Sequence, residues 1–69
     1  QENLMNKNIN KFDRFKYYSE QAANSERRGE LQDAKEQWAI AELNAPNARN
    51  REWCKHRAAF CERVLRKPF

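Results

Sequence analysis

The sequence contains very little glycine, proline, cysteine or histidine. Its 69 residues include one Gly, two Pro, two Cys and one His. So few turn-forming residues argue against a meander of strands joined by tight turns. A chain of this length holds one domain with a thin core. We therefore predict an all-α fold.

The scarcity of cysteine and histidine also limits the chemistry. A zinc site needs about three or four converging ligands, whereas His56 would lie on the opposite face of a helix from Cys54 and Cys61. On one helix, these cysteines would be roughly 10 Å apart, too far for a disulfide, so we expect reduced thiols. No glycine-rich phosphate loop or thiol–histidine pair is present. We predict no catalytic residue, no metal and no cofactor, and therefore no enzyme.

Long apolar runs are absent too. No stretch approaches the roughly 18 apolar residues that span a bilayer, and the N-terminus lacks the apolar core of a secretory signal. We expect a cytoplasmic protein that does not bind membranes.

Positive charge is concentrated near the C-terminus. The chain carries 14 basic and 10 acidic residues, and positions 48–69 hold seven of the basic and two of the acidic ones. This distribution favours an acidic protein surface or nucleic acid as partner. A net charge of +4 is also ordinary for a soluble small domain.

Hydrophobic periodicity predicts three helices, over about 12–28, 30–44 and 48–66, in a single domain spanning 12–67. The first should end at Gly29, which can adopt a left-handed cap, and the second before Pro46. Asn47 or Asn50 should cap the third. Residues 1–11 are rich in asparagine, so we expect an extension that is frayed or contacts a second copy.

The spacing of small and aromatic residues in the second helix resembles half of a tetratricopeptide unit. We therefore predict a tetratricopeptide-like αα-hairpin with a packed, amphipathic C-terminal helix that acts as a cap or pairs with a second copy. The chain could also be part of a longer scaffold of such repeats. The residues with this spacing are Gly29, Ala34, Trp38, Ala41 and Pro46.

The third helix divides into an apolar and a basic face. Trp53 and Phe60 lie on the apolar face with Cys54 and Cys61, and we predict that all four point inward. The basic face suggests nucleic-acid contact in a helix-turn-helix arrangement, or simply a solvated surface, because Glu52 and Glu62 are mixed into it. The residues for possible nucleic-acid contact are Arg51, Lys55, Arg63 and Arg66.

Two charged residues fall on apolar helix faces. Arg57 lies among the apolar residues of the third helix, and Glu26 continues the apolar stripe of the first. A charge in such a position must be paired or reach solvent. We predict a structural Glu26–Arg57 ion pair; the alternative is that Arg57 lies over Trp53 and extends its charged end into water.

Two groups of apolar residues are candidates for binding a partner. Tyr17 faces away from the hairpin and could join Phe12 and the apolar residues Leu4, Met5 and Ile9 in a patch. Ile40 and Leu43 form a second apolar edge on the second helix. The sequence does not distinguish between these two surfaces.

Several short motifs resemble the ANR family, small negative regulators of AraC-type virulence activators in Gram-negative bacteria. The resemblance covers residues 17–63 and rests on Tyr18–Ala23, Glu26, Gly29, Ala34, Trp38, Ala41, Asn50–Trp53, Arg57 and Phe60–Cys61. It implies a transcriptional repressor that binds an AraC/XylS-type activator and blocks its dimerisation or DNA binding. It also implies contact with nucleoid-structuring proteins and at most weak or indirect contact with DNA. A class of small activators shares the glycine, the tryptophan and the basic C-terminal helix.

Overall fold

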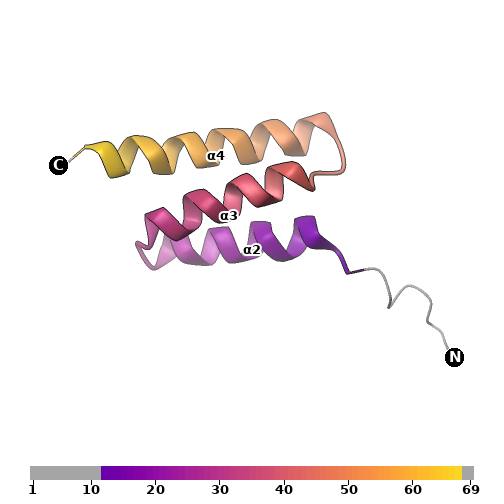
Figure 1. Cartoon of the computed structure of the whole chain (residues 1–69), viewed down its shortest axis with the longest axis horizontal. Coiled ribbons are helices and arrows are strands. Elements are labelled where there is room, and N and C mark those ends of the chain that lie inside the picture. Colours follow the sequence, from indigo (N-terminus) through magenta and orange to yellow (C-terminus); the bar gives the residue numbers. More distant parts are fainter. Residues whose placement is uncertain (1–11, 68–69) are drawn as a thin grey trace, which may run out of the picture.

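The computed structural model describes residues 12–67, which form three α-helices and no strand. These are α2 (Arg14–Arg27), α3 (Leu31–Leu43) and α4 (Ala48–Arg66). They run side by side in alternating directions, with α3 between α2 and α4 (Figure 1). The all-α prediction is confirmed. The proposed dimer contact of residues 1–11 lies outside the described residues, as do Leu4, Met5 and Ile9.

Polar side chains determine where two of the helices begin. The Asp13 carboxylate accepts a hydrogen bond of 3.0 Å from the backbone N–H of Lys16. Helix α2 therefore starts at Arg14, slightly later than the predicted start near Phe12, because Asp13 is extended and caps the helix. The Asn47 side chain accepts from the Asn50 N–H at 2.9 Å, so Asn47 is the cap of α4.

The turn between α2 and α3 depends on the single glycine. Gly29 has φ +79°, a left-handed conformation that other residues adopt at a cost. The N–H of Glu30 donates to the carbonyl of Ser25 at 2.8 Å, and that of Gly29 donates to Glu26 at 3.0 Å. This pair of bonds is a Schellman motif, which ends α2 and reverses the chain. The predicted glycine cap is confirmed.

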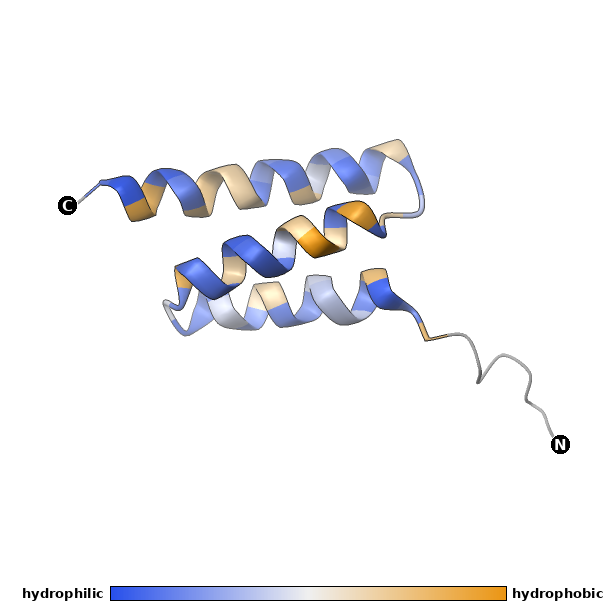
Figure 2. Cartoon of the chain, in the orientation of Figure 1, coloured by the Kyte–Doolittle hydropathy of each residue, from blue (hydrophilic) through white to orange (hydrophobic). Residues whose placement is uncertain are grey.

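The core is thin and made mostly of small residues. Trp38 is the only large apolar side chain in the described part of the chain that is fully buried. Small neighbours let α2 and α4 approach α3 closely, and Figure 2 shows hydrophobic positions scattered along otherwise hydrophilic helices. The buried apolar residues are Ala22, Ala34, Trp38, Ala41, Cys54 and Cys61.

The apolar face of α4 is only partly covered. Cys54 and Cys61 are buried as predicted, but Trp53 is 48% exposed and Phe60 37% exposed. The prediction that these two aromatic side chains point inward holds only in part, because each keeps more than a third of its surface exposed. Because α4 packs chiefly against α3, only a narrow arc of its apolar face is covered. Trp53 still contributes to packing, since its ring meets that of Trp38 edge-on at 4.8 Å.

Candidate functional site

The Glu26 carboxylate connects all three helices. Trp38 of α3 donates its indole N–H to Glu26 Oε1 at 2.9 Å. Arg57 of α4 donates from Nε to the same oxygen at 3.4 Å, and its Nη2 forms an ion pair with Oε2. The predicted Glu26–Arg57 pair is confirmed. The Arg57 guanidinium lies 4.8 Å from the centre of the Phe60 ring, rather than over Trp53.

This cluster is suited to fixing the fold. The Glu26 side chain is 14% exposed, so its negative charge requires the partners that Trp38 and Arg57 supply. Arg57 remains 38% exposed and reaches water at one edge. Sequence reasoning missed the Trp38 bond, although a buried indole N–H usually has an acceptor and Glu26 lies on the apolar stripe of its helix.

Two further polar contacts join neighbouring helices. Ser25 donates its hydroxyl to the Gln37 side chain at 2.8 Å, between α2 and α3. Lys35 Nζ lies 2.8 Å from Glu62 Oε1, between α3 and α4. The hydrogen bond and charge of Lys35 lower the pKa of Glu62. This contact therefore adds stability above the ordinary carboxyl pKa, and the contribution is lost as the pH falls through the lowered value.

Both cysteines are buried and free. Burial raises the pKa of the Cys54 thiol, and the charge of Glu42 raises it further. Burial and Glu26 likewise raise the pKa of Cys61, with Arg57 acting in the opposite direction. A raised pKa keeps these groups as thiols, which are poor nucleophiles and poor metal ligands.

We expect both thiols to react slowly with a disulfide reagent while the protein is folded. At neutral pH, labelling of the native chain should be at least about tenfold slower than labelling in denaturant. The rate should keep rising with pH beyond the ordinary thiol pKa. The measurement is the absorbance of released thiolate, with the denatured chain as the control. Equally fast labelling of the native chain would contradict the buried placement.

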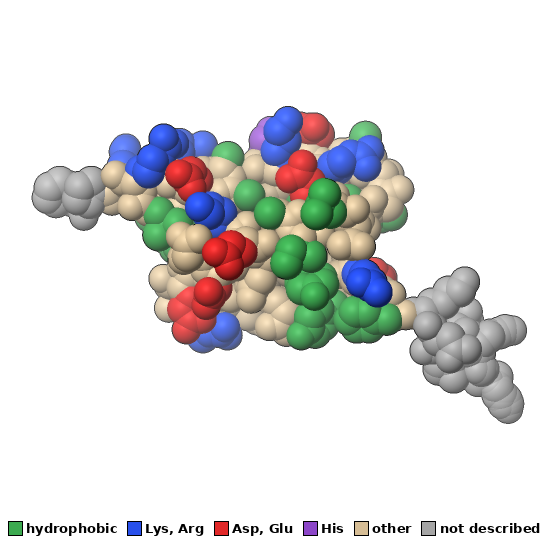
Figure 3. Space-filling view, viewed as in Figure 1, with side chains coloured by type: hydrophobic (Ala, Val, Ile, Leu, Met, Phe, Trp, Pro, Cys, Tyr) green, Lys and Arg blue, Asp and Glu red, His purple; other side chains and the backbone are tan. Residues whose placement is uncertain are grey.

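Exposed apolar side chains gather where α2 begins and α3 ends (Figure 3). We call Phe12, Tyr17, Ile40 and Leu43 the α2–α3 apolar patch; all four are exposed, and Leu43 is 85% exposed. The rings of Phe12 and Tyr17 are 5.3 Å apart between centres. The hairpin therefore brings the two candidate partner surfaces to the same end of the molecule.

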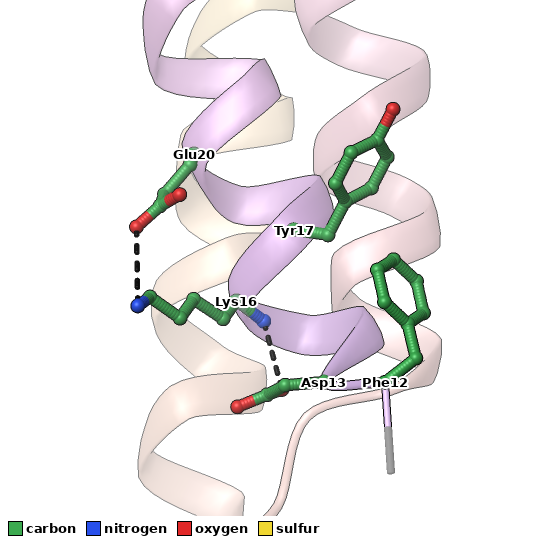
Figure 4. A pocket seen from close by; sticks show the side chains of 5 residues that line it. All are labelled: Phe12, Asp13, Lys16, Tyr17 and Glu20. Atoms are coloured by element: carbon green, nitrogen blue, oxygen red, sulfur yellow. Dashed lines mark hydrogen bonds and ion pairs between the residues drawn. The ribbon is translucent and has the colours of Figure 1, made fainter. Parts of the chain in front are cut away.

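A shallow hollow lies beside this patch, lined by Phe12, Asp13, Lys16, Tyr17 and Glu20. Figure 4 shows the two rings on one side of it and the polar side chains on the other. The polar residues interact locally: Asp13 caps α2, and Lys16 Nζ lies 4.0 Å from Glu20. None of these lining residues is a histidine or a cysteine, and the two aromatic residues are the hydrophobic ones among them.

The four candidate nucleic-acid residues are all exposed on α4. Acidic groups are mixed among the cations: Arg66 lies 3.5 Å from Glu62, and the nearby His56 lies 3.9 Å from Glu52. Helices α3 and α4 lie alongside each other (Figure 1), whereas the helices of a helix-turn-helix cross at about 90–120°. The four residues are Arg51, Lys55, Arg63 and Arg66.

Within residues 12–67, no group of three metal-binding side chains comes together. No helix in the same part of the chain is long and apolar enough to cross a membrane.

Comparison with known proteins identifies a relative from a prophage. No family model and no solved structure matches the chain. Over 63 residues the sequence is 36% identical to a Haemophilus influenzae protein described as an "uncharacterized protein in Mu-like prophage FluMu region". The match covers 91% of this chain and 85% of the relative. The chain therefore belongs to the same family as this FluMu prophage-region protein.

Proposed function

We propose that this protein is a transcriptional regulator without enzymatic activity. In this proposal it binds an AraC/XylS-type activator and blocks the activator's dimerisation or its binding to DNA, as the resemblance to the ANR family implies. The observation that carries the proposal is the α2–α3 apolar patch.

The distribution of apolar side chains supports a binding role. Eight large hydrophobic residues are exposed within residues 12–67, whereas Trp38 alone is large and fully buried. Leu43, at 85% exposure, contributes almost nothing to the core. Clustered exposed apolar side chains are typical of surfaces that bind other proteins, and a partner would remove this area from water.

The proposal is tested by measuring how the protein affects DNA binding by the AraC-type activators of its host. The wild-type protein should weaken an activator's affinity for its promoter. Leu43→Asp should reduce this effect by at least about tenfold, because a carboxylate would be desolvated in the contact. Gln32→Asp is the matched control, since it adds the same charge at an exposed position nearer the start of α3.

The Gln32→Asp variant should act like the wild type, and circular dichroism should show that both variants are folded. If no activator of the host responds to the wild-type protein, the proposal is wrong. Co-purification with an activator would identify the target, and the same experiment reports any nucleoid-structuring protein or second copy that binds.

Direct DNA binding is the second candidate, because the basic residues of α4 are exposed. Contacts with phosphates alone would give affinity that falls steeply with salt and ignores sequence. Titrating promoter and random DNA across a salt series separates the two candidates. A preference for promoter DNA that persists near physiological salt would favour a DNA reader.

A further inference from the structure

A second set of exposed apolar side chains lies along α4, on a different helix from the residues of the α2–α3 apolar patch. Trp53, Arg57, Phe60 and Val64 follow one another at intervals of four, three and four residues. This spacing places them on one face of the helix over about three turns. All four are at least one third exposed. We call these residues the α4 stripe.

Contacts with the rest of the molecule hold this stripe in place. Trp53 packs edge-on against the buried Trp38, and Arg57 lies between Glu26 and the Phe60 ring. The positive charge of Arg57 is therefore already paired within the chain. An apolar side chain could cover the stripe without burying an unpaired charge, and the aromatic groups lose little freedom on binding.

The border of the stripe is basic. Arg49, His56, Arg63 and Lys67 follow at intervals of seven, seven and four residues, which places them along one edge. All four are exposed. The nearby acid is Glu52, 3.9 Å from His56. Among residues 12–67 this is the one ion pair that involves the edge, so Arg49, Arg63 and Lys67 are available to a partner.

We propose that the α4 stripe binds an amphipathic helix of another protein whose apolar face is bordered by acidic residues. Apolar side chains at helical spacing would pack on Trp53, Phe60 and Val64, in the helix-on-helix mode of recognition. The carboxylates of the partner helix would face Arg49, Arg63 and Lys67. The stripe suits a helical segment of roughly 11–14 residues at 1.5 Å per residue.

Charge complementarity favours this occupant over a second copy of the chain. Two α4 helices packed through their stripes would bring two basic edges together, and like charges at an interface oppose association. An acidic helix instead gains from every cation along the edge. This inference goes beyond the proposed function, because it concerns a different surface and requires no AraC-type activator.

A displayed peptide library provides the test. Each peptide is a helix with leucine at fixed apolar positions and random residues at the flanking positions, and the wild-type protein is the bait. Peptides enriched on the protein should carry Asp or Glu on one flank. A selected peptide should bind Phe60→Asp or Val64→Asp at least about tenfold more weakly, and Arg63→Glu should also weaken it.

Leu43→Asp is the control for this experiment, because it alters only the α2–α3 apolar patch and should leave peptide affinity unchanged. Circular dichroism checks that each variant is folded. Selected flanks that are neutral or basic would overturn the proposal. So would an absence of enrichment, or a dimer in sedimentation that Phe60→Asp dissociates. The effect of Leu43→Asp on DNA binding by an activator, which tests the proposed function, does not depend on these results.

Discussion

Replacing Trp38 with alanine is expected to unfold most of the protein. Truncating a fully buried tryptophan costs about 3–5 kcal/mol in lost burial and in the cavity that remains. A domain of this size rarely has more than about 3–5 kcal/mol of stability in total. The other buried apolar residues are alanines and cysteines, which are too small to fill the space, and Trp53 would lose the ring that it meets edge-on. The variant should lose most of its helical circular dichroism without denaturant.

Two further variants test whether the loss of folding is specific to the buried Trp38 side chain. Trp38→Phe keeps an aromatic ring but removes the N–H that Glu26 accepts, so it should remain folded with a lower denaturation midpoint. Leu43→Ala removes a large side chain that is already exposed, and its free energy of unfolding should change by less than about 0.5 kcal/mol. Cooperative unfolding of Trp38→Ala at the wild-type midpoint would contradict the central role of Trp38.

Replacing Glu26 with alanine should have the second largest effect. The change removes the acceptor of the buried Trp38 N–H and the partner of Arg57 at once. Hydrogen bonds to charged groups contribute about 1.5–3 kcal/mol each. Because Arg57 can turn toward water, we expect a total loss of about 2–3 kcal/mol. Urea denaturation measures this loss. Glu20→Ala is the control, since the one ion pair of Glu20 within residues 12–67 is with Lys16, and both side chains are exposed.

A double-mutant cycle separates the two roles of Glu26. Glu26→Gln keeps an oxygen that can accept from Trp38, so it should cost less than Glu26→Ala. Combining Glu26→Ala with Arg57→Ala should cost less than the sum of the single changes, with a coupling energy of about 0.5–3 kcal/mol. Strict additivity would mean that the ion pair contributes nothing to stability.

The helices and the ion pair could be predicted because their signals are local. Apolar periodicity, Gly29 and Asn47 mark the helix ends within a few residues of the chain. Glu26 and Arg57 could be matched because each is a charge on an apolar face.

The coverage of α4 could not be predicted in the same way. A helical wheel reports which residues share a face, but not how many neighbouring helices cover that face. The sequence-based prediction therefore places Trp53 and Phe60 deeper in the core than the structure does. The Lys35–Glu62 contact could not be predicted from the sequence either, because the chain has many other charged residues with which each could pair.

The placement of the candidate partner residues depended on the hairpin. From the sequence, Tyr17 and the Ile40–Leu43 edge were alternatives more than 20 positions apart. The antiparallel packing of α2 on α3 brings the start of one helix to the end of the other. Their proximity depends on how α2 and α3 are aligned in the hairpin, and this alignment cannot be read from either segment alone.

The side-by-side order of the helices has a consequence for the speed of folding. Helix α3 packs on the helix before it and the helix after it, so most packing joins segments that are close along the chain. Short loops cost little entropy to close, and domains dominated by such contacts fold in microseconds to milliseconds. The Glu26–Arg57 pair spans 31 residues and links the two outer helices. It should therefore form late, after both helices have docked on α3.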